Sequence, residues 1–491
     1  MRGATLVVLA FVATTAAAVP IPQDPSASPV PAFVGETAVA RRTRLRRVPE
    51  HPFMAPNGRS NVHDDAYQTD AYTLAGPLGR DPEVLSTLRS AECGSVTFDS
   101  AGSIVTICVG VEGPRLERID PVTLETQAVF PLPPRAGGGG GSPFTDFSGG
   151  GYFYLDEQDR AVTPTNSRQI WIVADTDAGF VLDRVYDLAT VVVAPDAIIS
   201  VLPDWSGRLW FATVEGLVGT VDRDSGVART LALDGEAIGN SFAVDETGGV
   251  FIVSDHALYR FDAGPSGEPV VTWRELYDRG TRLKPGQTNF GSGTTPTLMG
   301  KRWIAITDNA DPQMHVLVYW RAATVGRPRL VCSAAVFADG RGATENSLMT
   351  TGKSLVVENN YGYDGLMAVM NGATTDPGIS RVDVRGGRCR VRWTNGEPVP
   401  SVVSKLSGGS GLVYTYTKDP GPGSTDAWYF TAVSFRTGAT VYKRLVGTGF
   451  GYNNNFAPVS LGPDGTAYVG VLGGLTLVRD APRGTRQPTR R

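Results

Sequence analysis

Side chains with oxygen donors recur at matching places in the chain, just before or just after short apolar segments with the character of β-strands. Those before such segments are Asn240, Glu345, Asn346 and Asn455, and those after them are Asp308, Asn309, Glu358, Asn359 and Asn360. Carboxylate and amide oxygens are the ligands that hard cations prefer, and calcium takes about six to eight of them. The pattern predicts a calcium site, for which the candidate ligands are Glu345, Asn346, Asn240, Asp308 and Asn455. The other four residues are predicted contacts for a polar ligand. The alternative is that all of them satisfy the backbone of turns around a hydrated channel.

Histidine is scarce, with four residues in the chain, so candidates for acid–base chemistry are few. His63 is followed by two aspartates, and His256 follows Asp255. Because histidine titrates near neutrality, His63 and His256 are the predicted catalytic residues if the protein is an enzyme. The alternative for His63 is a structural role, in which its segment is fastened across the fold. No Gly-x-Ser-x-Gly elbow, phosphate loop or His-Glu-x-x-His motif occurs in the sequence, and the glycine run at 137–141 is interpreted as a loop.

The elements that carry these residues follow an internal repeat. The unit is a short apolar strand, a turn containing Asp and Gly, a second β-rich strand and two further strands, and its copies begin near positions 95, 152, 199, 241, 295, 346, 401 and 456. Repeats of this length are typical of four-stranded propeller blades. We therefore predict an all-β fold, a single β-propeller of about eight four-stranded antiparallel blades, with seven possible. A pair of β-sandwiches is the structural alternative.

The last copy ends after three strands, whereas Glu83–Ser90 is an unassigned segment before the first copy. We expect this segment to close the ring as the missing strand, because closure removes exposed sheet edges. In a propeller blade the first strand is innermost, and the connections before the first strand and after the second emerge on one face. The candidate residues should therefore gather on one face around the channel.

Segments outside the repeats have distinct compositions. We expect a signal peptide at 1–18, because Arg2 precedes an apolar run and a small-residue cleavage site, and a membrane anchor is the alternative. Residues 19–50 are rich in Pro, Ala and Arg and are interpreted as a flexible linker. The basic run at 41–47 is interpreted as part of this linker, and the alternatives are that it is a processing site or a patch that binds the cell wall. Residues 51–91 form an N-terminal arm, 92–480 the propeller and 481–491 a basic tail. The predicted location is secreted.

Four cysteines in an exported chain favour two disulfides. Cys93 and Cys108 flank one predicted hairpin, while Cys332 and Cys389 lie near the outer ends of successive repeats. We predict the pairs 93–108 and 332–389. A zinc site is the alternative, but the sequence lacks a short paired spacing such as Cys-x-x-Cys.

The overall charge argues against polyanionic partners. The formal net charge is −4, and nucleic-acid and membrane binders usually carry a basic field. We expect a monomer that takes a small-molecule ligand or substrate, with no nucleic acid and no membrane as partner.

Three short motifs carry a family resemblance: Asn240-Ser241-Phe242-Ala243-Val244-Asp245, Thr307-Asp308-Asn309 and Gly462-Pro463-Asp464-Gly465-Thr466-Ala467-Tyr468. They resemble motifs of secreted bacterial propellers of the gluconolactonase and strictosidine-synthase-like superfamily, whose members usually have six blades. In that superfamily a calcium ion held by Glu, Asn and Asp on the channel face can serve a lactonase or esterase. The resemblance implies a calcium-dependent hydrolase of lactones or esters. The alternative is a non-catalytic secreted scaffold that binds a small molecule or a protein.

Overall fold

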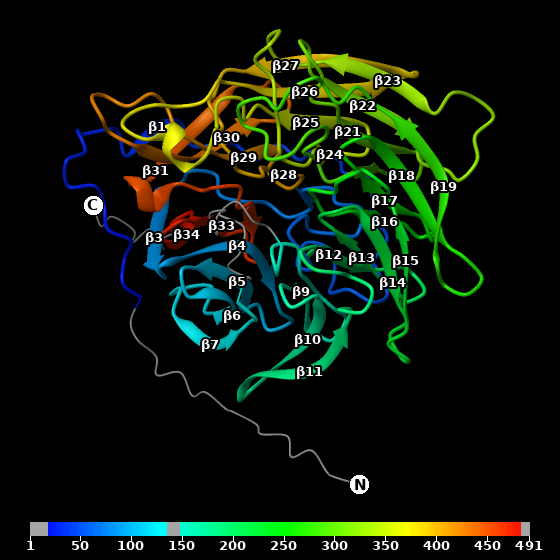
Figure 1. Ribbon diagram of the computed structural model, residues 1–491. Coiled ribbons are helices and arrows are strands. Elements are labelled where there is room, and N and C mark those ends of the chain that lie inside the picture. Colours follow the sequence, from blue (N-terminus) through cyan, green and yellow to red (C-terminus); the bar gives the residue numbers. More distant parts are fainter. Residues whose placement is uncertain (1–17, 135–147, 483–491) are drawn as a thin grey trace.

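The computed structural model describes residues 18–134 and 148–482, and the expected signal peptide, the glycine run at 137–141 and the tail from 483 lie outside this part. Eight β-sheets of the described chain are arranged as blades around a central axis (Figure 1). The predicted all-β propeller of eight four-stranded antiparallel blades is therefore confirmed. The helical structure among these residues is confined to two 3₁₀ turns, Leu366–Val369 and Phe450–Tyr452. No helix in the described ranges is long and apolar enough to span a bilayer.

Blades one to four follow the chain from their innermost strand outward. Blade one is β4 (Ala91–Phe98), β5 (Ile104–Gly110), β6 (Gly113–Ile119) and β7 (Thr126–Pro131). Blade two is β8 (Tyr154–Leu155), β9 (Ala161–Thr165), β10 (Gln169–Thr176) and β11 (Gly179–Asp187). Blade three is β12 (Ile198–Pro203), β13 (Leu209–Thr213), β14 (Leu217–Val221) and β15 (Ala228–Ala232). Blade four is β16 (Ala243–Val244), β17 (Val250–Val253), β18 (Ala257–Ala263) and β19 (Pro269–Leu276).

Blades five to seven continue in the same way. Blade five is β20 (Thr297–Met299), β21 (Trp303–Thr307), β22 (His315–Trp320) and β23 (Leu330–Ala335). Blade six is β24 (Met349–Thr350), β25 (Ser354–Glu358), β26 (Ile379–Arg385) and β27 (Arg388–Asn395). Blade seven is β28 (Lys405–Ser407), β29 (Leu412–Thr417), β30 (Ala427–Ser434) and β31 (Thr440–Thr448), extended at its two edges by β2 (Ala71–Tyr72) and β1 (Phe33–Gly35).

Blade eight is built from both ends of the propeller. Its inner strands are β32 (Val459–Leu461), β33 (Ala467–Val471) and β34 (Gly474–Arg479), and its outer strand is β3 (Glu83–Leu88). β3 pairs antiparallel with β34 along its whole length, from Glu83 opposite Arg479 to Leu88 opposite Gly474. The segment expected to close the ring thus occupies the position of the missing fourth strand. Closure joins the first and last copies of the repeat and covers the outer edge of β34.

The turns between first and second strands form because Asp and Gly stabilise them. In blade three, Oδ1 of Asp204 accepts the backbone N–H of Ser206 at 2.8 Å and that of Arg208 at 3.1 Å. Gly207 in the same turn has φ +84°, a conformation that other residues rarely adopt. Asp245 and Gly248 repeat the arrangement in blade four. We call the end of the propeller that carries these turns the turn face.

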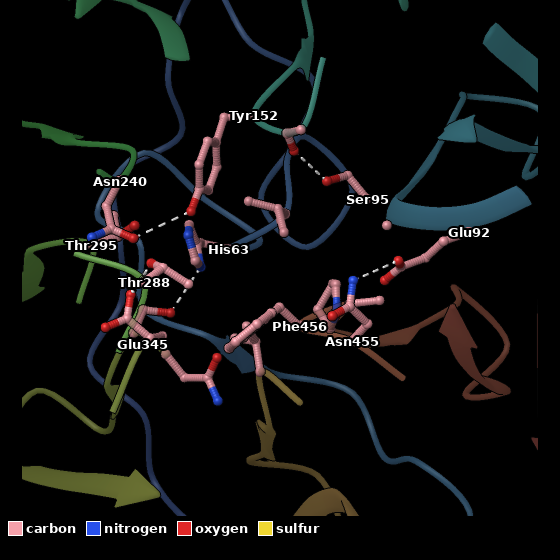
Figure 2. Close-up of a pocket in the computed structure, with 18 of the residues that line it drawn as sticks. His63, Glu92, Ser95, Tyr152, Asn240, Thr288, Thr295, Glu345, Asn455 and Phe456 are labelled. Carbon is pink, nitrogen blue, oxygen red and sulfur yellow. Dashed lines mark hydrogen bonds between the residues drawn. The ribbon is translucent and has the colours of Figure 1, made fainter. Parts of the chain in front are cut away.

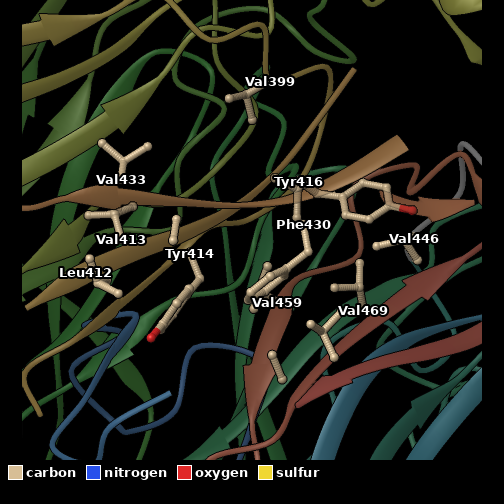
Figure 3. Close-up of a cluster of buried hydrophobic side chains, with 14 of the residues drawn as sticks. Val399, Leu412, Val413, Tyr414, Tyr416, Phe430, Val433, Val446, Val459 and Val469 are labelled. Carbon is tan, nitrogen blue, oxygen red and sulfur yellow. The ribbon is translucent and has the colours of Figure 1, made fainter. Parts of the chain in front are cut away.

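The core lies between neighbouring blades, so both faces of most inner strands are buried. All six residues of β29 are buried, with Leu412, Tyr414 and Tyr416 on one face and the intervening residues on the other. Figure 3 shows these side chains with Phe430 of blade seven and with Val459 and Val469 of blade eight. Each fully buried side chain of this size contributes about 1.5–3 kcal/mol relative to an exposed one. The packing between blades therefore contributes to holding the ring together, beside the strand pairing within each blade.

The N-terminal segment differs from the expected flexible linker. Within 19–50, β1 pairs with β31 of blade seven, and the backbone N–H groups of Arg41, Thr43 and Arg46 donate to carbonyls of the turn face. The local composition lacks strand periodicity, and the pairing arises because the outer edge of blade seven offers free backbone groups. In Figure 1 the blue trace passes from β1 into the middle of the ring.

Residues 59–72, which we call the hub segment, run around the central axis. Their backbone carbonyls accept N–H groups from the inner strands of successive blades: Arg59 from Phe98, Ser60 from Leu155, Ala66 from Val244, Tyr67 from Leu298, Thr69 from Thr350 and Asp70 from Leu406. The order of the acceptors along the chain follows the order of blades one, two, four, five, six and seven. Each donor lies at or near the turn-face end of its strand. The hub segment therefore fills the channel from the turn face.

Two disulfides join the predicted cysteines. Cys93 of β4 bonds Cys108, its cross-strand neighbour in β5, with an S–S distance of 2.05 Å. Cys332 of β23 bonds Cys389 of β27 and so links the outer strands of blades five and six. Both predicted pairings are confirmed.

Candidate functional site

A central cavity of about 100 Å³ lies in the channel, on the side of the hub segment away from the turn face. Its walls come from the residues just before the inner strands of several blades, among them Tyr152, Asn240, Thr295 and Glu345. Val62 and His63 of the hub segment also line it. The repeat therefore brings residues far apart in sequence to one place, and the hub segment adds a histidine to them.

His63 is held by Asp70 of the same segment. The imidazole Nδ1 lies 3.1 Å from each carboxylate oxygen of Asp70, and both side chains are buried. The hydroxyl of Ser347 donates to Asp70 and lies 3.0 Å from the same Nδ1. Because an ionised carboxylate can only accept, Nδ1 of His63 is the donor, and Nε2 of the neutral ring is then an acceptor. Nε2 is buried without a hydrogen-bond partner among the described residues.

Lys405 keeps Asp70 ionised. The lysine is the first residue of β28, fully buried, and its Nζ donates to Asp70 and to the carbonyl of Val62. Burial alone would raise the pKa of Asp70, but the charge of Lys405 and the hydrogen bonds from His63 and Lys405 outweigh it and the pKa is lowered. Burial would also lower the pKa of Lys405, but Asp64, at 3.4 Å, and Asp70 hold it above its ordinary value. The site therefore contains an ion pair fixed beneath His63.

Glu345 differs from Asp70, because its pKa is raised and that of Asp70 is lowered. Its Oε2 accepts the hydroxyl of Thr288 at 2.6 Å, and its Oε1 has no partner within the described ranges. No cation faces it, so burial raises the pKa of Glu345 to about 8, although the hydrogen bonds from Thr288 oppose the shift. The group is therefore neutral at pH 7 and carries a proton that it can donate.

The two sides of the cavity differ in character. Figure 2 shows His63, Tyr152, Asn240 and Glu345 on one side, while Glu92 and Asn455 lie across from them. The hydroxyl of Tyr152 donates to Oδ1 of Asn240 at 3.4 Å, and Nδ2 of Asn455 donates to Glu92 at 3.0 Å. Burial raises the pKa of Tyr152, and the carboxyls of Glu345 and Asp70 add to the shift. His63, Tyr152 and Glu345 thus gather on one wall, and Glu92 lies on the other.

The cavity contains four of the five residues that the sequence proposes as metal ligands. Asn240, Glu345, Asn346 and Asn455 all line it. Asn346 donates through Nδ2 to Glu358 at 2.9 Å, and its Oδ1 is unpartnered in the part of the chain that the structure describes. Asp308, the fifth, does not line the cavity: its carboxylate accepts from Nδ1 and the backbone N–H of His315.

The predicted ligand-binding residues have structural partners instead. The amide of Asn309 bridges the backbone of Gly291 and Thr344. Asn360 accepts the N–H of Glu345 at 3.0 Å and donates to the carbonyl of Val399. Asn359 holds the backbone of Arg341 and Ala343 in the same manner, and Glu358 accepts the N–H of Ser404 at 3.0 Å. These side chains position the loops that carry Glu345 and Asn346, which matches the alternative reading of the polar cluster.

The second predicted catalytic histidine lies outside the cavity. His256 follows β17, and its Nδ1 is 2.8 Å from Asp255 while Arg279 contacts both ring nitrogens. Its side chain is 34% exposed, compared with 3% for His63. The structure therefore separates the two histidines and leaves only His63 beside Glu345.

Asp70, Lys405 and Tyr152 belong to the site but were not among the sequence candidates. The sequence could have identified Lys405, since a lysine at the start of an apolar inner strand must be buried and paired. It could not have identified Asp70 and Tyr152, because their roles depend on the path of the hub segment through the channel.

A calcium site needs several oxygen donors in one place. Within residues 18–134 and 148–482, no group of three or more His, Cys, Asp or Glu side chains is placed to hold a metal ion. Among the described residues that line the cavity, Glu345 and Asn346 each have a fully buried side-chain oxygen without a partner, and the carboxyl of Glu345 has its pKa raised to about 8. Calcium prefers about six to eight oxygens that include ionised carboxylates. These residues do not by themselves fit a calcium site.

Comparisons with known proteins give distant similarities. No family model matches the chain. A protein of Archaeoglobus fulgidus, described as uncharacterized, is 26% identical over 335 residues, which cover 61% of this chain and 64% of that protein. The chain therefore spans less than two thirds of this relative's length.

Among solved structures, BamB from Moraxella catarrhalis has a TM-score of 0.38 at 12% identity, covering 66% of this chain and 96% of that one. Streptogramin B lyase has a TM-score of 0.40 at 10% identity, covering 81% and 97%. A functionally unknown protein from Desulfotomaculum acetoxidans has a TM-score of 0.39 at 11% identity, covering 68% and 95%. The assignment of the fold as an eight-bladed propeller stands on the sheets described above.

Proposed function

We propose that the central cavity is an acid–base catalytic site that hydrolyses a small ester or lactone. The observation that carries the proposal is the pairing of two unlike groups on one wall. His63 has Asp70 at Nδ1 and an unpartnered Nε2, and Glu345 is a carboxyl group with its pKa raised to about 8 and an unpartnered Oε1. A base and a neutral acid on one wall of a cavity are what general acid–base catalysis requires.

The proposed reaction uses only these side chains and water. Nε2 of His63 accepts a proton from a water molecule as the water oxygen bonds to the carbonyl carbon of the substrate. Asp70 holds the ring and stabilises the imidazolium that forms. Glu345 donates its proton to the leaving alkoxide oxygen as the carbon–oxygen bond of the ester breaks. Return of the proton from His63 to Glu345 through water then restores the starting state.

The substrate class follows from the resemblance to gluconolactonase-like propellers, and the size of the cavity limits it further. Ligand pockets usually measure about 300–1,000 Å³, whereas the central cavity is about 100 Å³. The cavity therefore admits the reacting group of a substrate, or a small lactone, but not a large ligand.

The test is a panel of small esters and lactones assayed with the wild-type protein and with His63→Gln and Glu345→Gln. Each substitution should lower kcat by about 10²–10⁴-fold, the usual contribution of a general acid or base. His256→Gln is the matched control, because it removes a histidine paired with an aspartate that does not line the cavity. Full turnover by folded His63→Gln protein would contradict the proposed base.

A non-catalytic binding scaffold is the second candidate. The small volume favours it, and so does the position of His63 and Asp70 in a cluster that also fastens the hub segment to Lys405. Thermal melts against the same ligand panel distinguish the two functions. A ligand that raises the melting temperature without being converted would support the scaffold.

Calcium is tested separately, because no step above runs through a metal. We would measure the melting temperature with added calcium and with a chelator. If calcium raises the melting temperature of the wild-type protein but not that of Glu345→Gln, the mechanism would have to include a calcium ion bound at Glu345.

Export is also part of the proposal. The two disulfides support it, since such bonds form and persist in oxidising compartments. Fractionation of the producing cells tests it, and a protein confined to the cytosol with reduced cysteines would contradict it.

A further inference from the structure

A second hollow, of about 680 Å³, lies on the turn face at the opposite end of the channel from the central cavity. Its charged lining consists of Arg44, Arg46, Arg47, Lys301 and Lys353, and none of the described residues that line it is acidic. We call it the cationic hollow. The three arginines come from the N-terminal segment, and the two lysines come from the first turns of blades five and six.

The five cations are exposed and unneutralised. None of them takes part in a salt bridge or a side-chain hydrogen bond within the described chain. Many other arginines are paired, for example Arg260 with Asp262 at 2.7 Å and Arg321 with Glu246 at 3.0 Å. The carboxylate of Glu50, near in sequence, accepts the N–H of Asn57 instead. Because the whole chain has a net charge of −4, this concentration of positive charge is not a general property of its surface.

The segment that carries the three arginines is also held in place. The backbone N–H of Arg46 donates to the carbonyl of Thr351 at 3.0 Å, and that of Thr43 donates to Gly408 at 2.8 Å. The stem of Arg46 lies against Gly300 and Gly352, where an added Cβ would come within 2.9 Å and 2.6 Å of its Cδ. Two glycines with positive φ thus leave the space that the arginine occupies. A fixed backbone lowers the entropy that the site loses on binding a ligand.

The geometry points to a binding site for a flexible chain of consecutive phosphate groups. Five unbalanced cations in one hollow match a ligand with several closely spaced negative charges, and arginine and lysine both bind phosphate oxygens. A phosphate chain has a charge on every unit, whereas a glycan whose only charges are uronate carboxylates has at most one on each sugar ring. Its lining, as far as the structure describes the chain, includes no aromatic residue and so offers no platform on which bases stack. The inference is independent of the function proposed for the central cavity.

The probe is inorganic polyphosphate, titrated at several salt concentrations. Wild-type protein should bind it, and Arg44→Ser/Arg46→Ser/Arg47→Ser should bind at least tenfold more weakly. The slope of log K against log salt should fall by about 2, since each lost phosphate contact removes about 0.7–0.9. A second variant, Lys301→Ser/Lys353→Ser, leaves the N-terminal segment intact and should also weaken binding.

The matched control is Arg385→Ser/Arg388→Ser/Arg390→Ser, which removes the same charge from exposed residues at the hairpin of β26 and β27. It should bind polyphosphate within twofold of wild type. Equal weakening by both arginine triples, or no binding by wild type at low salt, would overturn the inference. Tighter binding of a single-stranded oligonucleotide or of polygalacturonate than of polyphosphate would overturn the choice of ligand.

Discussion

Glu345→Gln should raise the stability of the protein at neutral and alkaline pH and leave it unchanged in acid. Burial raises the pKa of Glu345 from 4.5 to about 8, so the folded protein keeps this proton over a range where the unfolded chain loses it. Below pH 4.5 the carboxyl group is neutral in both states and costs nothing. Between pH 4.5 and 8 the cost to folding grows, and above pH 8 it is constant. Glutamine has the same shape and never ionises, so the variant avoids this cost.

The size of the effect follows from the gap between the two pKa values. At about 1.4 kcal/mol for each unit, the gap corresponds to roughly 5 kcal/mol at pH 8, as an upper bound. For a chain of 491 residues an unfolding entropy of about 2.1 cal/mol/K per residue gives about 1 kcal/mol/K, so the melting temperature should rise by about 5 °C at most. Thermal melts of both proteins from pH 4 to pH 9 measure it.

Glu236→Gln is a control of opposite sign. Burial would raise the pKa of Glu236, but hydrogen bonds from Ser254, Arg274 and Tyr259 outweigh it and the pKa is lowered. Its carboxylate therefore stabilises the fold above pH 4.5, and the substitution should lower the melting temperature at pH 7. A difference between wild type and Glu345→Gln that does not change with pH, or a wild type that is the more stable at pH 8, would refute the reasoning about Glu345.

Three further results are expected. Removing residues 1–90 should lower the melting temperature much more than removing residues 1–50, because only the longer deletion takes away β3 and the hub segment; equal melting temperatures would argue against ring closure. Lys405→Met should cost about 3–5 kcal/mol in urea denaturation, because it leaves two buried carboxylates without their cation; the exposed Lys353→Met is its control, and an equal effect of both would show that the buried pairing is dispensable. Replacing both cysteines of the disulfide between blades five and six with serine should cost about 2–4 kcal/mol, and peptide mapping that finds other pairings would contradict the connectivity.

The blades could be predicted from sequence because each copy of the repeat folds by local rules. Turns such as Asp204 to Gly207 have a backbone requirement that the residue types reveal, and the incomplete last copy indicates where the closing strand must come from. The inner strands begin within a few residues of the expected positions. The pairing of β1 with β31 could not be predicted, because it depends on a sheet edge formed about 400 residues later in the chain.

The candidate site was predicted only in part, for a related reason. The repeat places Asn240, Glu345, Asn346 and Asn455 around the channel, and their sequence positions show this directly. Sequence could not tell that Asn360 binds backbone while Glu345 faces a cavity, since the two residues have similar positions around the same strand pair. Nor could it join Lys405 to Val62 and Asp70, because those contacts exist only once the hub segment lies in the channel.

Because of the hub segment, the number of blades cannot change unless the hub segment changes as well. In a simple tandem array, a duplicated or lost unit alters only the curvature of the ring. Here the carbonyls of residues 59–70 accept from blades one, two, four, five, six and seven in chain order, so one blade more or fewer among them would leave the later donors out of step with their acceptors. A change in blade number would have to be accompanied by an insertion or deletion in a segment that precedes all the repeats. The length of the hub segment is therefore matched to the number of blades, and this match should keep the number of blades constant among descendants of this chain.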